Sequence, residues 1–147
     1  MKKILTLTLQ GDLIYVKLVS VIARNIAEIF AHETRATSNI SEFAHAFELS
    51  ISESFTNSVR YADPSNKAKE VTITFTTNKQ ELTATMIDSN SQFNPQTHSP
   101  VISSYPEGGY GLFLINHLMD KVSYSRSNGK NTLLMTKQVD VARPIHS

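Results

Sequence analysis

The 147-residue sequence contains no cysteine. This absence excludes disulfide frameworks, thiolate zinc sites and cysteine nucleophiles together. The sequence also has no surplus of either charge, because 14 basic and 13 acidic residues give a formal net charge of +1. Proteins that read nucleic acids usually carry a clear basic excess or a basic stripe. We therefore expect no direct nucleic-acid partner.

Long apolar runs are also missing, since none approaches the roughly 18 residues that a membrane-spanning helix needs. The basic start, Met1-Lys2-Lys3, resembles that of a signal peptide, but the apolar residues after it alternate with Thr6 and Thr8 and stop at Gln10. Such alternation is typical of a strand. We therefore expect a cytoplasmic protein that does not associate with membranes.

The length predicts a single domain over residues 1–147, with a core from about residue 3 to residue 138 and a frayed tail over residues 139–147. Within it, hydrophobic spacing predicts a strand over 4–9 and helices over about 13–35 and 40–62. Asn39, three residues before Glu42, is a variant capping box at the start of the second helix.

The second half of the chain is richer in strands. Alternation predicts two hairpins, over 71–88 and 122–137, the second with an Asn-Gly turn. Between them, residues 89–107 are polar and without period, and a connection of this length is usually functional or mobile. A third helix is expected to begin at residues 108–111. This clustering of strands favours an α+β fold, a two-layer α/β sandwich with a mixed, mainly antiparallel sheet and helices on one face.

Three sets of residues are candidates for chemistry. Glu53 and Asn57 lie one turn apart on the second predicted helix, near Ser50 and opposite the apolar residues. Such a pair is usually part of a solvated face. Alternatively, the carboxylate is a general base beside an amide oxygen that ligates Mg²⁺, a cation that prefers oxygen ligands.

Asp88 ends the first hairpin, where an aspartate commonly begins a turn; the functional alternative is an acceptor for an exocyclic amine. Gly108-Gly109-Tyr110-Gly111 stands at the start of the third helix. Glycines at a helix N-terminus form a possible phosphate cradle, because backbone N–H groups can approach an anion closely there. A few glycines in a loop are weak evidence alone.

Taken in order, these segments resemble the GHKL (Bergerat-fold) ATPases. Residues 48–59 resemble the N box of that family, and residues 86–95 resemble its first glycine box. The segment from Gly109 to Leu112, with the apolar helix that continues to Val122, is similar to the second glycine box, and Thr132 falls at the closing threonine position. Within the family, the resemblance points to the small anti-sigma-factor serine kinases of bacteria.

The resemblance implies the histidine-kinase-like ATPase fold and a role for each motif. Glu53 is implied as the base that deprotonates the attacking serine, Asn57 as the residue that holds Mg²⁺ against the phosphates of ATP, and Asp88 as the acceptor for the adenine amino group. It implies further nucleotide-binding positions at Asn90, Phe93, Gly108, Gly109, Gly111, Leu112 and Thr132.

The resemblance also implies partners. An anti-sigma factor of this kind holds a sigma factor and phosphorylates a serine of a STAS-type anti-sigma antagonist, and related kinases form homodimers. The first glycine box departs from the family pattern Asp-x-Gly-x-Gly, because Asn90 and Gln92 replace the glycines. Asn90 is expected to take up a left-handed backbone, whereas the same conformation at Gln92 costs roughly 1–2 kcal/mol.

That departure keeps an alternative open: a non-catalytic binding module of the same fold that sequesters a sigma factor or another regulatory partner. Other classes are disfavoured. A sensor histidine kinase needs a phosphoacceptor histidine on a preceding helix pair, and His32 and His45 lie too close to the N box. The five histidines form no His-x-x-x-His pair for zinc, and no Gly-x-Ser-x-Gly hydrolase motif is present.

Overall fold

A computed structural model describes residues 1–60, 70–90 and 109–142. Its elements follow the order predicted from the hydrophobic pattern, and the strands and helices are as follows: β1 (Lys2–Gln10), the 3₁₀ turn η1 (Leu13–Tyr15), α1 (Val16–Glu33), α2 (Ile40–Arg60), β2 (Glu70–Asn78), β3 (Glu81–Asp88), α3 (Gly109–Leu118), β4 (Lys121–Ser127) and β5 (Lys130–Gln138).

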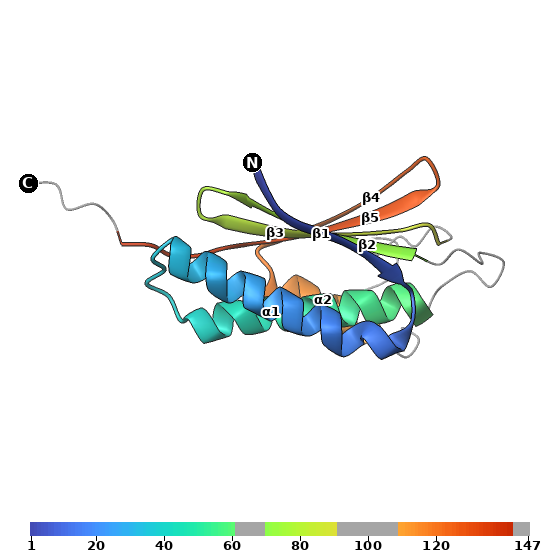
Figure 1. Cartoon of the computed structure of the whole chain (residues 1–147), viewed down its shortest axis with the longest axis horizontal. Coiled ribbons are helices and arrows are strands. Elements are labelled where there is room, and N and C mark those ends of the chain that lie inside the picture. The colour runs from blue at the N-terminus through green and yellow to red at the C-terminus, as the bar shows by residue number, and fades with distance from the viewer. Residues whose placement is uncertain (61–69, 91–108, 143–147) are drawn as a thin grey trace, which may run out of the picture.

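The five strands form one sheet in the order β1-β2-β3-β5-β4. Each neighbouring pair of these strands is antiparallel. The three α-helices lie together on one face of the sheet (Figure 1). The predicted two-layer α+β sandwich with helices on one face is therefore confirmed, and the sheet, expected to be mixed and mainly antiparallel, is antiparallel in all of its described strand pairs.

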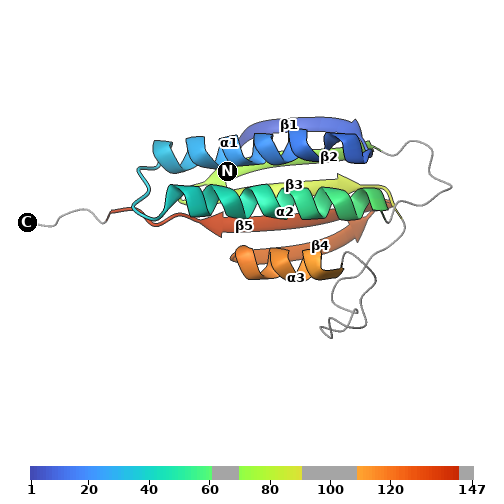
Figure 2. The same cartoon turned by 90° about the horizontal axis from the view of Figure 1, so that it is seen from below.

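The middle helix, α2, runs between α1 and α3 and packs against both (Figure 2). On the sheet beneath, alternate residues of β2 and β3 are buried, as a period of two requires. Phe43 of α2 stacks on Phe30 of α1 with ring centroids 6.1 Å apart and meets Phe47 edge-on at 5.2 Å. The buried residues of β2 and β3 are Val71, Ile73, Phe75, Leu82, Ala84 and Met86.

The opposite face of the sheet carries threonines in cross-strand pairs. Hydroxyl oxygens lie 3.1 Å apart in Thr6–Thr74, 2.8 Å apart in Thr8–Thr72 and 2.8 Å apart in Thr83–Thr136. No helix of the described residues covers this face (Figure 1). The two faces of the sheet are thus chemically distinct, and any residue on a strand can be assigned to one of them by its register.

The end of the helical layer where α1 connects to α2 is fixed by two sets of contacts. The Asn39 side chain accepts from the backbone N–H of Glu42 at 3.1 Å, which confirms the predicted cap of α2. At the other end of the chain, the expected frayed tail is corrected for residues 139–141. Val139 is fully buried, the N–H of Thr37 donates to the carbonyl of Asp140 at 2.8 Å, and Val141 bridges to Ala36.

Candidate functional site

Glu53 and Asn57 lie in the second half of α2 and are both half-buried. The polar residues around them do not form a solvated face, because Ser50 is fully buried and Ser54 is 3% exposed. The reason is that α2 has neighbours on both sides and the sheet beneath it, so few of its positions face water. The expectation that this side of the helix is solvated is therefore corrected.

The side-chain oxygen of Asn57 is buried and has no hydrogen-bond partner among the described residues. A buried acceptor that is left unpaired costs free energy, on the order of 1–3 kcal/mol, and needs a reason. One turn earlier, the carboxylate of Glu53 makes no hydrogen bond or ion pair within the described part of the chain. An amide oxygen and a carboxylate one helical turn apart, neither with a partner among the described residues, fit a site that binds a hard cation such as Mg²⁺.

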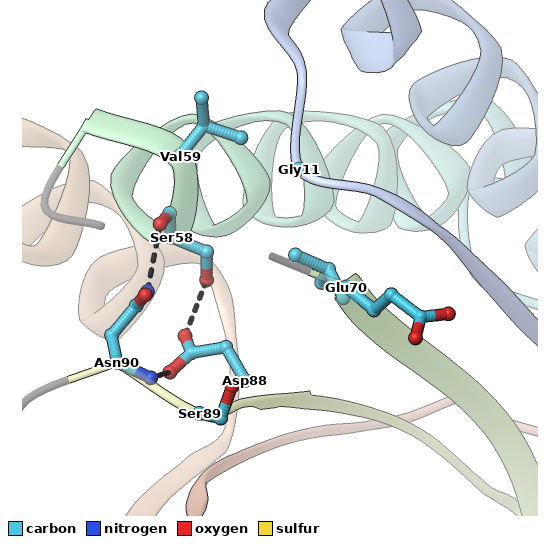
Figure 3. Close-up of a pocket in the computed structure, with 8 residues that line it drawn as sticks. Gly11, Ser58, Val59, Glu70, Asp88, Ser89 and Asn90 are labelled. Atoms are coloured by element: carbon cyan, nitrogen blue, oxygen red, sulfur yellow. Dashed lines mark hydrogen bonds between the residues drawn. The ribbon is translucent and has the colours of Figure 1, made fainter. Parts of the chain in front are cut away.

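Asp88 lies at the end of β3 and its carboxylate is held from two sides. Its Oδ2 accepts from the hydroxyl of Ser58 at 2.8 Å, and its Oδ1 accepts from the backbone N–H of Asn90 at 3.1 Å (Figure 3). The side-chain amide of Asn131 also donates to Oδ1, at 2.9 Å. A carboxylate oxygen accepts about two hydrogen bonds, so Oδ2 keeps a position for a further donor.

Asn90 is 8% exposed, and its side-chain amide donates to the backbone carbonyl of Ser58 at 2.8 Å (Figure 3). Its own carbonyl accepts from Arg126 at 2.8 Å and from Asn131 at 3.0 Å. The non-glycine residues described with positive φ are Arg35, Lys79 and Asn128. Asn90 is not among them, so the expected left-handed backbone is corrected: this residue fastens β3 to α2 with its side chain.

Thr132, expected on the adenine side, lies on the threonine-rich face of the sheet. It pairs with Ile87 of β3 and Ser125 of β4, one position away from Asn131. Successive strand residues point to opposite faces, so the contact with Asp88 is made by Asn131 and Thr132 points away from it. This corrects the prediction for Thr132.

The sequence reasoning missed Asn131 together with Ser58, Tyr124 and Arg126, although one signal was present. Met135 of β5 is buried, and counting back from it in steps of two reaches Asn131. The same count along β3, from Ala84 and Met86, reaches Asp88. Both residues therefore lie on the helix-covered face, where the register pairs them directly.

The second glycine-rich segment is described in its backbone from Gly109 onward, where α3 begins. This agrees with the predicted start of the third helix, and Gly111 and Leu112 lie in its first turns. Gly108 and Phe93, like Gln92, lie outside the described residues. Their predicted roles in nucleotide binding therefore remain predictions.

A small pocket lies between the end of α2 and the end of β3, beside Gly11 (Figure 3). Ser58, Asp88 and Asn90 line it, and its volume is about 10 Å³. This is about the space that a single water molecule needs. The pocket is therefore much smaller than an adenine ring, and a nucleotide at Asp88 needs space beyond it.

Residues 1–60, 70–90 and 109–142 contain no group of three or more histidine, aspartate or glutamate side chains that converge as metal ligands. They also contain no helix that is both long and apolar enough to cross a membrane.

An α+β sandwich with a Glu-x-x-x-Asn helix beside a strand that ends in aspartate is the arrangement expected of a histidine kinase-like ATPase domain. The chain belongs to this GHKL family, because residues 14–137 match the family model described as a histidine kinase-like ATPase domain. The resemblance inferred from the motifs is thereby confirmed.

Curated relatives give a more specific likeness. The serine-protein kinase RsbW of Bacillus subtilis is 32% identical over 108 residues, which cover 67% of each chain. The protein of the same name from Listeria monocytogenes is 29% identical over 102 residues, 63% of this chain and 64% of that protein. The chain thus spans about two thirds of the length of these relatives.

Two solved structures share the fold. The RsbU and RsbW domains of a Mycobacterium tuberculosis protein match 95% of this chain with a TM-score of 0.61 and 14% identity. The histidine kinase domain of a blue-light-activated kinase from Erythrobacter litoralis matches 82% of it with a TM-score of 0.55 and 14% identity. This chain spans 35% and 61% of those two chains, so the likeness concerns the fold alone.

Proposed function

We propose that this chain is an ATP-dependent serine kinase that acts as an anti-sigma factor. The observation that carries the proposal is the buried side-chain oxygen of Asn57, one turn after the Glu53 carboxylate, since neither group has a partner among the described residues. An enzyme that must bind a nucleotide with its cation has a use for both groups, whereas a scaffold incurs the cost of burying them without benefit. The serine-protein kinases among its relatives support the same activity.

The proposed reaction transfers the γ-phosphoryl group of ATP to a serine hydroxyl. The serine oxygen forms a bond to the γ-phosphorus while the bond to the bridging oxygen of ADP breaks, and Glu53 accepts the serine proton. Asp88 accepts from the amino group of adenine and thereby orients the nucleotide. Asn57 would hold Mg²⁺, which supplies positive charge beside the phosphates when it is bound. Gly109 and Gly111 would place backbone N–H groups against the phosphates.

The proposed partners are a sigma factor and a STAS-type antagonist whose serine is phosphorylated. A phosphoryl group adds a charge of about −1.5 to −2 and disrupts an interface through repulsion and desolvation. Phosphorylation would therefore release the antagonist and leave the kinase to hold the sigma factor. We place this switch in the cytoplasm, with the chain acting as a homodimer.

The second candidate is a non-catalytic binding module, and Asn90 favours it. A buried side chain at this position, bonded to the end of α2, stands where the family has a glycine. Its amide ties the strand to the helix and limits how far the two can separate to admit a base. Such a module would bind its protein partner and leave ATP unused.

The two candidates are separated by one experiment in two parts. The melting temperature is measured with Mg-ATP, because a ligand at 100 times its dissociation constant stabilises a protein by about 2.7 kcal/mol. The chain is then incubated with γ-labelled ATP and STAS-type antagonists from the same genome. Stabilisation with label transferred to a serine supports the kinase. Antagonist or sigma-factor binding with neither effect supports the binding module.

A further inference from the structure

We infer that Asn131 is a positioning residue that determines nucleotide specificity, because it fixes the Asp88 carboxylate in the orientation that accepts from adenine. The inference deepens the proposed function and rests on it, since it presupposes a nucleotide at Asp88. The motifs described above do not include Asn131. It comes from a row of three polar side chains that the sheet places side by side.

The row crosses three neighbouring strands. Asn131 of β5 pairs with Asp88 of β3 on one side and with Arg126 of β4 on the other. Its amide nitrogen donates to Asp88 Oδ1 at 2.9 Å and to the carbonyl of Asn90 at 3.0 Å. Its amide oxygen accepts from Arg126 at 2.8 Å and from the hydroxyl of Tyr124 at 2.6 Å.

These four hydrogen bonds fix the orientation of the Asn131 amide. An asparagine side chain has two N–H donors and an oxygen that accepts two bonds, and here all of them are used. A flipped amide would turn its N–H groups towards the guanidinium of Arg126, which is also a donor. Asn131 is 6% exposed, so water cannot readily replace the lost bonds.

A fixed Asn131 in turn fixes Asp88. Two donors occupy Oδ1, whereas Oδ2 receives the hydroxyl of Ser58 and keeps one acceptor position. The carboxylate cannot rotate without breaking the bond to Asn131. The oxygen that remains for a ligand therefore has a set direction, and Arg126 strengthens the chain of bonds by polarising the amide.

A carboxylate held in this way discriminates between purines. Adenine presents an amino group, a donor, where guanine presents a carbonyl oxygen, an acceptor. Asp88 Oδ2 pairs with the first and repels the second. If Asn131 no longer restrains it, the carboxylate can turn away from a guanine oxygen, and the preference for adenine decreases.

The test compares two variants. Asn131→Leu keeps the approximate size of the side chain but removes its hydrogen bonds. Arg126→Met changes an exposed residue and removes the hydrogen bond from Arg126 to the Asn131 amide oxygen. Ser125→Ala is the matched control, because Ser125 is an exposed residue on β4, next to Arg126. Dissociation constants for Mg-ADP and Mg-GDP are measured by titration calorimetry, and folding is checked by thermal melting. We expect ADP binding to weaken about 10- to 100-fold in Asn131→Leu. GDP binding should change little, and Arg126→Met should show a smaller shift in the same direction.

The outcomes separate the inference from the function on which it rests. Folded variants with a reduced ratio of ADP to GDP affinity support the positioning role. Variants that lose both nucleotides equally, or that keep the parental ratio, overturn it and leave Asn131 a merely structural residue, while ADP binding by the parent still upholds the proposed function. A parent chain that binds neither nucleotide overturns the function and the inference together.

Discussion

The hydroxyl of Ser58 donates to Asp88 Oδ2 at 2.8 Å and so joins the last turn of α2 to the end of β3. The backbone carbonyl of the same residue accepts from the Asn90 side chain, also at 2.8 Å. Because Ser58 follows Asn57 directly, these two bonds set the position of the cation-binding candidate relative to the adenine-binding candidate. The spacing of the site therefore depends on a residue that is not itself proposed to touch the nucleotide.

Ser58→Ala should weaken nucleotide binding and lower stability together. The substitution removes a hydrogen bond to a charged group, which contributes roughly 1.5–3 kcal/mol. We expect the free energy of unfolding, measured in urea, to fall by up to that amount, and the dissociation constant for Mg-ADP to rise. Ser52→Ala makes the same chemical change on the same helix and should alter neither quantity by as much. Equal effects from the two variants would contradict the role of Ser58.

Glu53→Gln should abolish phosphoryl transfer without preventing nucleotide binding. The amide keeps the shape of the side chain but cannot accept the serine proton, and loss of a general base usually slows a reaction about 10²- to 10⁴-fold. Transfer of label from ATP to the antagonist measures the rate, and calorimetry with Mg-ADP measures binding. Glu42→Gln, in the exposed first turn of α2, is the control. A Glu53→Gln protein that phosphorylates at the parental rate removes Glu53 as the base.

Asn57→Ala should reduce the dependence of nucleotide binding on Mg²⁺. The Asn57 oxygen has no partner among the described residues, so removing it breaks no hydrogen bond of that oxygen, and alanine favours a helix. Because the unpaired acceptor costs free energy, we expect the free energy of unfolding not to fall and to rise by up to about 1–3 kcal/mol. ADP titrations with Mg²⁺ and with a chelator measure the effect. The same ratio of the two affinities in parent and variant would show that Asn57 does not hold the cation.

The fold was predictable because its signals are local. Buried residues alternate along β2 and β3, and the Asn-Gly turn that joins β4 to β5 has the expected positive φ at both residues, 54° at Asn128 and 75° at Gly129. Such patterns depend on neighbours within a few residues. These patterns can therefore be recognised in the amino-acid sequence alone.

The site was predictable only in part. Glu53 and Asn57 lie one turn apart on a single helix, so a helical period brings them together. The bonds of Asp88 to Ser58 and Asn131 join distant segments, and the second depends on the register between β3 and β5. The sequence does not reveal that register, because the segment that follows β3 has no hydrophobic period. The closing threonine position of the motif therefore fell on Thr132, which is one residue away from Asn131 and on the other face of the sheet.

Two buried serines on α2 provide a test of stability that is independent of the nucleotide. The Ser50 hydroxyl is buried without a partner among the described residues, whereas that of Ser54 donates to the carbonyl of Ile51 at 3.2 Å. Ser50→Ala removes a desolvated hydroxyl and adds helix propensity, so we expect the free energy of unfolding to rise by about 1 kcal/mol. Ser54→Ala loses a hydrogen bond and should gain less. Urea unfolding of the two variants measures the difference, and a Ser50→Ala protein less stable than its parent would show that the hydroxyl has a partner in solution.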